Sequence, residues 1–269
     1  MIMNRVIIEE FGRQLVLFVR DEAIQLCDLN LRPDRDSTIS NRWREAAAVV
    51  GGEAMVIPDY VDAPIFQTLY EIDAQQNLHI LFTASNGETV DLLMEGSGEL
   101  AGWYAGPQVW RAWYSNERIA DAEDYADISA QYGTQDIPDD PAPNLDELEM
   151  PRRAIEELGI LLVRHVRDVA IQSCDVQLLP HSETAMANRW RKAALPFHNK
   201  VPPEVLIPDC VDETIFTFLR AIDQGLLPLS FVAENGETID LTKAGNLATR
   251  YIEPGGWRDT FSKERIGRD

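Results

Sequence analysis

Cysteine and basic residues are scarce in this chain of 269 residues. The three cysteines are too few, and too odd in number, for the disulfide framework of a secreted protein, so we expect reduced thiols and a cytoplasmic location. No apolar run reaches the roughly 18–20 residues that a membrane helix needs. The apolar residues at the amino terminus soon meet Glu9 and Glu10, unlike the longer apolar core of a signal peptide. We therefore expect a protein without a signal peptide or a membrane span.

Lysine and arginine together number 24, against 45 acids, for a formal net charge of -21. Residues 1–120 hold 18 acids and 9 bases, residues 121–150 hold ten acids and no base, and residues 151–269 hold 17 acids and 15 bases. A field of this sign repels nucleic acid and anionic membranes and favours a basic partner. The simpler interpretation, in which the acidity only keeps the protein soluble, stays open.

The sequence contains one pattern twice. Residues from about Gly12 to Ile119 recur in the same order from Gly159 to Ile266. The matches include Val19-Arg20-Asp21 with Val166-Arg167-Asp168, Asn41-Arg42-Trp43-Arg44 with Asn188-Arg189-Trp190-Arg191, Ile57-Pro58-Asp59 with Ile207-Pro208-Asp209, and Asn86-Gly87-Glu88 with Asn235-Gly236-Glu237. We therefore predict a tandem duplication of a unit of about 110 residues. Repeat 1 covers 1–120, an extended acidic linker with prolines covers 121–150, and repeat 2 covers 151–269.

Helical spacing fills the first part of each repeat. Apolar residues three and four apart predict an amphipathic helix from Phe11 to Leu26. A short helix is expected around Trp43, and a third helix after Ile57-Pro58-Asp59, with Asp62 as its N-cap and Pro64 in its first turn.

Strands are expected in the second part of each repeat. Two apolar runs flank Asn86-Gly87, a strong signal for a hairpin. Further strands are predicted over Leu100 to Tyr104 and, in repeat 2, over Thr249 to Ile252. The predicted fold class is α+β, with about three helices followed by a small antiparallel sheet in each repeat.

Catalytic patterns do not recur in both repeats. None of the four histidines has a counterpart at the matched position, and no serine lies in a Gly-x-Ser-x-Gly turn. The glycine-rich segment from Gly96 to Gly102 lacks the lysine of a phosphate-binding loop. We expect no metal site, no cofactor and no enzymatic activity.

The polar residues that do recur are the candidates for function. Asp21 and Asp28 share a helix face, which is either a polar contact strip or a solvated face with local ion pairs to Arg20. Arginines beside Trp43 suit a binding hot spot, or the tryptophan anchors the second helix while the arginines pair with nearby acids. The aspartates at 59 and 62 are either a carboxylate pair or helix caps.

We hypothesise that these residues bind a basic protein, which the acidic chain occludes as an immunity protein or inhibitor occludes a bacterial toxin. The hypothetical partner-binding residues of repeat 1 are Asp21, Asp28, Arg42, Trp43, Arg44, Asp59, Asp62, Trp103 and Trp110. Their equivalents in repeat 2 are Asp168, Asp175, Arg189, Trp190, Arg191, Asp209, Asp212 and Trp257. The repeats are expected to pack as a pseudo-dimer. The alternative is a small-ligand protein or an enzyme with an arginine and carboxylate cleft between the repeats.

Overall fold

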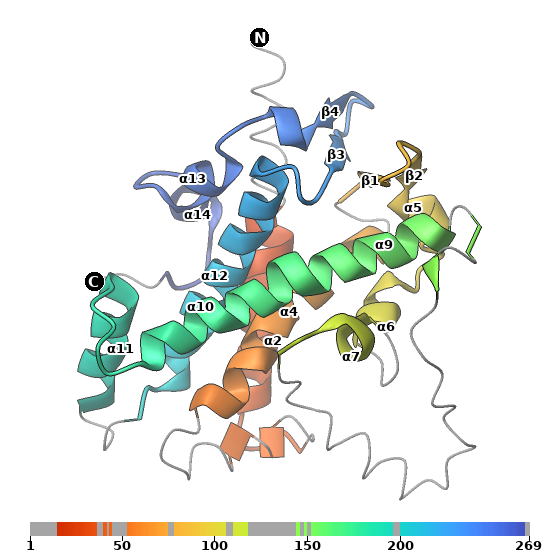
Figure 1. Ribbon diagram of the computed structural model, residues 1–269. Coiled ribbons are helices and arrows are strands. Elements are labelled where there is room, and N and C mark those ends of the chain that lie inside the picture. Colours follow the sequence, from red (N-terminus) through yellow and green to blue (C-terminus); the bar gives the residue numbers. More distant parts are fainter. Residues whose placement is uncertain are drawn as a thin grey trace, which may run out of the picture.

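Two long helices pack against each other at the centre of the structure (Figure 1). Helix α4 (Glu53–Asp73) belongs to the first half of the chain, residues 1–120, and α12 (Pro203–Asp223) to the second half, residues 151–269. The computed structural model describes residues 15–36, 40–41, 43–44, 53–74, 78–105, 110–117, 144–145, 148–149, 152–195 and 200–266. The predicted boundaries at residues 120 and 150, and nearly all of the predicted linker, lie outside these residues.

Helix α4 starts earlier than the spacing predicted and passes through Pro58 and Pro64. A proline inside a helix removes a backbone hydrogen bond and costs about 3 kcal/mol or more, which burial of an apolar face offsets. The buried face of α4 includes Ile57, Val61, Ile65, Leu69 and Ile72. The prediction of Asp62 as an N-cap is therefore wrong, because Asp62 lies in the helix interior. Asp212 has the same place in α12, which passes through Pro208.

The predicted amphipathic helix is confirmed where the structure describes it. A π-helical segment, η1 (Leu15–Arg20), leads directly into α2 (Asp21–Leu31). In the second half, α9 (Arg152–Leu162), η3 (Val163–Arg167) and α10 (Asp168–Leu178) follow one another without a break. Each π segment ends on an arginine that is fully buried, Arg20 or Arg167.

The predicted short second helix is also present. Residues 40–41 and 43–44 are helical, and the second half has α11 (Ala185–Ala194). Thr184 caps α11, since its hydroxyl accepts a hydrogen bond from the Ala187 amide. Trp43 and Trp190 turn inward from these helices and are buried.

Both halves contribute to a single four-stranded antiparallel sheet. Its strands are β1 (Ile80–Thr83), β2 (Thr89–Asp91), β3 (Leu229–Val232) and β4 (Thr238–Asp240), in the order β2-β1-β3-β4. Strands β1 and β3 pair at the centre, where Leu81 lies opposite Ser230. Gly87 and Gly236 adopt positive φ angles in the turns that lead to β2 and β4, a conformation that glycine adopts without strain.

The strands predicted over residues 100–104 and 249–252 are wrong, because both segments are helical. They form α6 (Leu100–Ala105) and α13 (Leu247–Ile252). A carboxylate in the last turn of each long helix caps the amino end of α6 or α13. Asp73 accepts a hydrogen bond from the Ala101 amide, and Asp223 accepts hydrogen bonds from the amides of the first two residues of α13. Such a cap lies more than twenty residues away in sequence, so the local apolar pattern did not indicate it.

The remaining short helices complete the two halves. They are α5 (Leu92–Glu95), α7 (Trp110–Tyr114), η5 (Leu241–Lys243) and α14 (Trp257–Phe261). The described residues thus form an α+β fold, as predicted, and apolar residues of both halves join in one core.

Candidate functional site

Asp62 is the centre of a buried polar cluster to which both halves contribute. Its carboxylate accepts hydrogen bonds from Tyr104 Oη at 2.7 Å, Arg111 Nη1 at 2.7 Å and, from the second half, Arg167 Nε at 2.7 Å. Burial opposes ionisation of Asp62, but the guanidiniums of Arg167 and Arg111 outweigh it and lower the pKa of this carboxyl. Burial, with the Asp62 charge, raises the pKa of Tyr104 well above its usual value. The cluster therefore holds an ionised aspartate between two arginines.

Asp212 is the centre of an equivalent cluster with the roles of the halves exchanged. It accepts from Tyr251 Oη at 2.6 Å, from Arg258 Nη1 at 3.1 Å and, from the first half, from Arg20 Nε at 2.5 Å. Burial disfavours the charge on Arg20, yet Asp212 and its neighbours raise the pKa of the guanidinium above its usual value. Each half thus supplies the arginine that pairs with the buried aspartate of the other half.

Asp21 and Asp168 extend these clusters towards the chain segments that follow α14 and α7. Asp21 accepts from the Ser262 hydroxyl and from the Lys263 amide, both at 2.7 Å. Asp168 accepts from the Ser115 hydroxyl at 2.6 Å and from the Asn116 amide at 2.7 Å. Asp21 and Asp168 are therefore buried contact residues, as one of the two interpretations of this helix face predicted. Their contacts are with residues of the same chain.

The two matched tryptophans anchor their helices to the long helices. Trp43 Nε1 donates to Asp59 Oδ2 at 2.6 Å, and Trp190 Nε1 donates to Asp209 Oδ2 at 2.6 Å. Arg189 also binds Asp209, with Nη2 2.6 Å from Oδ1. Burial still raises the pKa of Asp209, against the effect of these donors. The anchoring interpretation of the tryptophans therefore fits the structure.

The other hypothetical site residues do not come together in one cluster. Arg44 donates to the Arg35 carbonyl and to Asn41, and Arg191 makes the equivalent bonds to Ser182 and Asn188. Trp103 packs partly buried beside the buried Trp110, their ring centroids 6.1 Å apart, and Trp257 is buried in the second half. Asp175 is partly buried on α10. The side chains of Asp28 and Arg42 lie outside the described residues.

Residues that the sequence analysis did not single out complete the clusters. They are Tyr104, Arg111 and Ser115 in the first half and Tyr251, Arg258 and Ser262 in the second. The signal that could have found them is their identity at matched positions in the two halves.

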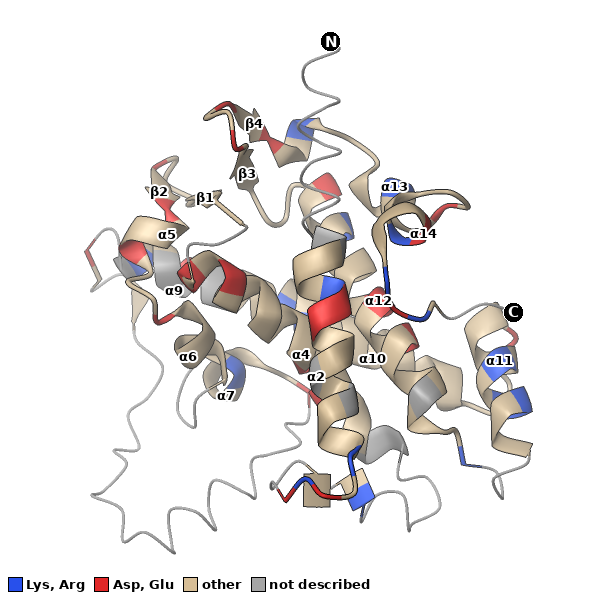
Figure 2. Cartoon of the chain, turned by 180° about the vertical axis from the view of Figure 1, so that it is seen from behind, with Lys and Arg blue, Asp and Glu red and all other residues tan. Residues whose placement is uncertain are grey.

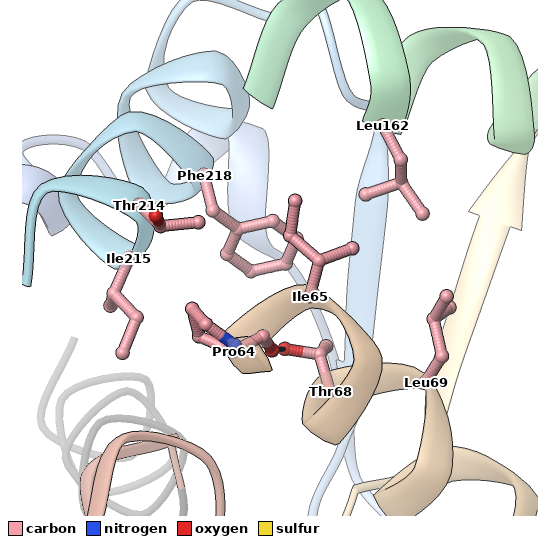
Figure 3. Close-up of a pocket in the computed structure, with 8 residues that line it drawn as sticks. All are labelled: Pro64, Ile65, Thr68, Leu69, Leu162, Thr214, Ile215 and Phe218. Atoms are coloured by element: carbon pink, nitrogen blue, oxygen red, sulfur yellow. Dashed lines mark hydrogen bonds between the residues drawn. The ribbon is translucent and has the colours of Figure 1, made fainter. Parts of the chain in front are cut away.

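A small void lies where α4, α9 and α12 meet (Figure 3), lined by Pro64, Ile65, Thr68, Leu69, Leu162, Thr214, Ile215 and Phe218. Its free volume of about 10 Å³ has room for about one water molecule. The threonine hydroxyls bond to carbonyls of their own helices, Thr68 to Pro64 and Thr214 to Cys210. The arginines and carboxylates of the hypothetical cleft do not line this void.

Both halves contribute to the outer face of the sheet. Along each strand buried side chains alternate with partly exposed ones, as expected of a sheet with one face on the core. The inner face holds Ile80, Phe82, Val90, Leu229, Phe231 and Ile239, all buried. The outer face holds Leu81, Thr83, Thr89, Ser230, Val232 and Thr238, which are partly or largely exposed.

Acids are frequent in the segments that include the four strands. Residues 79–99 and 228–243 contain seven acids and one basic residue, Lys243. The acids are Glu88, Asp91, Glu95, Glu99, Glu234, Glu237 and Asp240, and all are partly or largely exposed. Figure 2 shows acidic residues on both hairpins, and basic residues on α11 at the other end of the molecule. We call the outer face and these seven acids the acidic sheet surface.

Two carboxylates of the acidic sheet surface are held in matching orientations. Asn86 Nδ2 donates to Glu88 Oε2 at 2.9 Å, and Asn235 Nδ2 donates to Glu237 Oε2 at 3.0 Å. Each asparagine also accepts from the backbone amide of its glutamate, at 2.9 Å. The two turns therefore present an oriented negative charge at either side of the sheet.

Within the described ranges, no group of three or more histidine, cysteine, aspartate or glutamate residues is arranged to hold a metal ion. The described helices also include none with the length and apolar character needed to cross a membrane. A scan against protein-family models and searches among curated proteins and solved structures find no match for this chain.

Proposed function

We propose that this chain is a cytoplasmic protein-binding module, and that its docking surface is the acidic sheet surface. In this proposal the chain is a tandem duplication of an α+β unit, each with an Asn-Gly hairpin, whose copies pair as an internal pseudo-dimer. The partner is a basic protein. The observation that carries the proposal is the set of seven acids in the two segments that form an outer sheet face to which both halves contribute.

The composition of the surface favours a protein partner. The central residues of the outer face, Leu81, Thr83, Ser230 and Val232, are small or of medium size and are partly exposed. Interfaces between proteins commonly have a less polar centre with a polar rim. Here the apolar side chains of Leu81 and Val232 lie near the centre, while Glu88 and Glu237 lie at the rim.

The charge of the surface favours a basic partner over nucleic acid or an anionic membrane. Complementary charges speed association and exclude partners of the same sign. Hydrogen bonds from Asn86 and Asn235 orient two of the carboxylates before binding, so less side-chain freedom is lost on association. Binding here would cover the basic surface of the partner, and inhibition of a toxin by an immunity protein is one instance of such a role.

The test compares two variants of equal charge. In the first, Glu88, Glu234 and Glu237 are changed to glutamine; in the matched control, the exposed Glu22, Glu183 and Glu253 are changed instead. Each immobilised full-length protein is incubated with a lysate of the native host at physiological salt. We expect the wild type and the control to retain the same basic protein in stoichiometric amount, and the first variant to retain at least about tenfold less, which corresponds to about 1.4 kcal/mol.

Equal retention by the two variants would show that the acidic sheet surface is not the docking site. Failure of all three proteins to retain a basic partner would count against the binding function itself.

A further inference from the structure

Several contacts between the two halves occur twice, with the roles of the halves exchanged. Arg20 of the first half binds Asp212 of the second, and Arg167 of the second binds Asp62 of the first. Gln25 donates to Glu264, and Gln172 donates to Glu117. When residue i contacts residue j and the equivalent of j contacts the equivalent of i, the interface has the twofold symmetry of a homodimer. The halves are therefore related as two subunits of a dimer would be.

The sheet and the long helices follow the same symmetry. Strands β1 and β3 are antiparallel, and the pair Leu81 and Ser230 lies at the centre of their register. These two residues stand at equivalent places in their strands, so the twofold axis passes close to this pair. Helices α4 and α12 also pack against each other. The interface thus includes backbone hydrogen bonds, an apolar core and both buried clusters.

Neither half contains a complete cluster. In the first half, Asp62 has Tyr104 and Arg111 as local partners and Arg20 has Asp21, but the second half supplies Arg167 to Asp62 and Asp212 to Arg20. Arg20 and Arg167 are fully buried, and removal of one partner from a buried ion pair is strongly unfavourable. Each half therefore needs a complementary half, although nothing in these contacts requires that half to belong to the same chain.

We infer that the half-to-half interface also forms between two copies of this chain, and that the length of the connection between the halves decides which arrangement is adopted. With a long connection, the first half pairs with the second half of its own chain. With a short one, it pairs with the second half of another chain, and two chains form a dimer with two equivalent lobes. Such exchange of identical elements between protomers is a common route to dimers.

The geometry sets the length at which the change occurs. The end of the first half lies beside Asp168, because the Asn116 amide is 2.7 Å from Asp168 Oδ2. The second half begins at Arg152, sixteen residues before Asp168 along consecutive helical segments. At about 1.5 Å per residue these segments separate the two points by roughly 24 Å. An extended chain spans at most about 3.6 Å per residue, so about seven residues are needed to join Glu117 to Arg152 within one lobe. Residues 118–151 provide 34.

The experiment replaces residues 118–151 of the full chain with either of two connections. The short variant has four residues, Gly-Ser-Gly-Ser, which span at most about 14 Å. The control has a flexible glycine and serine connection of the original 34 residues. Light scattering after gel filtration measures the mass, and circular dichroism measures the helix content. We expect the control to be a monomer and the short variant to be a dimer of twice that mass, with equal helix content per chain. A short variant that is folded and monomeric would overturn the inference.

A second variant decides the question if the short variant does not fold. It has a protease site in the middle of the 34-residue connection and is cleaved after purification. We expect the two pieces to elute together at the volume of the intact chain, to separate in denaturant and to reassemble when the denaturant is removed. Pieces that separate under native conditions would show that the interface does not form between chains, and the inference would then be wrong.

Discussion

Substitutions in the Asp62 cluster should reveal a direct energetic link between the two halves. The perturbations are Asp62→Asn and Arg167→Met, alone and together, because Asp62 Oδ1 and Arg167 Nε lie 2.7 Å apart. Asp62→Asn removes the carboxylate that Arg167 and Arg111 share in a buried site, although Arg167 keeps its contact with Asp168 at 3.4 Å. Breaking a buried pair by removing one partner costs about 3–5 kcal/mol. Arg167→Met should cost a similar amount, since Asp62 then retains only Arg111 and Tyr104.

The double variant should be more stable than the sum of the single effects implies. Once Asp62 is neutral, the loss of Arg167 no longer leaves a buried carboxylate underpaired, so we expect a coupling energy of about 1–3 kcal/mol. The assay is urea unfolding followed by tryptophan fluorescence. Tyr104→Phe provides a milder change in the same cluster, at about 1.5–3 kcal/mol for one hydrogen bond to a charged group.

The matched control pairs Arg167→Met with Asp212→Asn. These two residues belong to different clusters and share none of the hydrogen-bond partners described above, so their effects should add to within about 0.5 kcal/mol. The reasoning would be refuted if the effects of Asp62→Asn and Arg167→Met were additive. It would also be refuted if Arg167→Met and Asp212→Asn showed a coupling energy as large as that expected for Asp62 with Arg167.

The Asp62 contribution should also depend on pH. The folded state lowers the pKa of Asp62, so its stabilising effect is present above the ordinary pKa of about 3.9 and is lost as the pH falls through the lower value of the folded state. The difference in unfolding free energy between the wild type and Asp62→Asn should therefore shrink on acidification below about pH 4.

Three further predictions concern single sites. Burial raises the pKa of Glu213 despite its hydrogen bond from Ser173. Ionisation of Glu213 therefore destabilises the fold as the pH rises past the pKa of the unfolded state. In urea unfolding, Glu213→Gln should be more stable than the wild type at pH 7, and the difference should be smaller at pH 4. A Cβ at Gly256 would lie 2.2 Å from the Arg250 carbonyl oxygen, so Gly256→Ala should lower the free energy of unfolding by about 1–3 kcal/mol. Gly102→Ala, in open space within α6, should raise it by about 0.5–1 kcal/mol. Equal effects of the two substitutions would refute the close contact at Gly256. The three cysteines are buried, so a thiol reagent should label the native protein only at the rate of unfolding, and rapid labelling without denaturant would contradict that burial.

The sequence predicted the fold class because helical and strand periodicities are local. The amphipathic helix that contains α2, the helix around Trp43 and the presence of a helix after Ile57 all follow from apolar spacing over one or two dozen residues. Helices α6 and α13 were missed because their caps, Asp73 and Asp223, lie more than twenty residues away. Local pattern carries no information on such a contact.

The candidate site was only partly predictable, for a related reason. Comparison of the two matching parts of the sequence singled out Asp62, Asp21 and Trp43 as recurring polar or aromatic residues. It did not indicate that Asp62 meets Arg167, because these residues are 105 positions apart and lie in different halves. The acidic sheet surface was missed because its acids come from two distant segments, 79–99 and 228–243, which the pairing of β1 with β3 brings together.

The exchange of arginines between the halves has a consequence for synthesis of the protein. Arg20 and Asp212 are 192 residues apart, and at about 5–20 residues per second a ribosome needs roughly 10–40 s to make the second after the first. During this time the nascent first half lacks Asp212 as a partner for Arg20. Until Arg167 is made, it also lacks Arg167 as a partner for Asp62. It lacks these contacts with the second half until the second half is made, and it must remain soluble in the meantime. The 18 acids and 9 bases of residues 1–120 give the waiting segment a net negative charge that opposes aggregation.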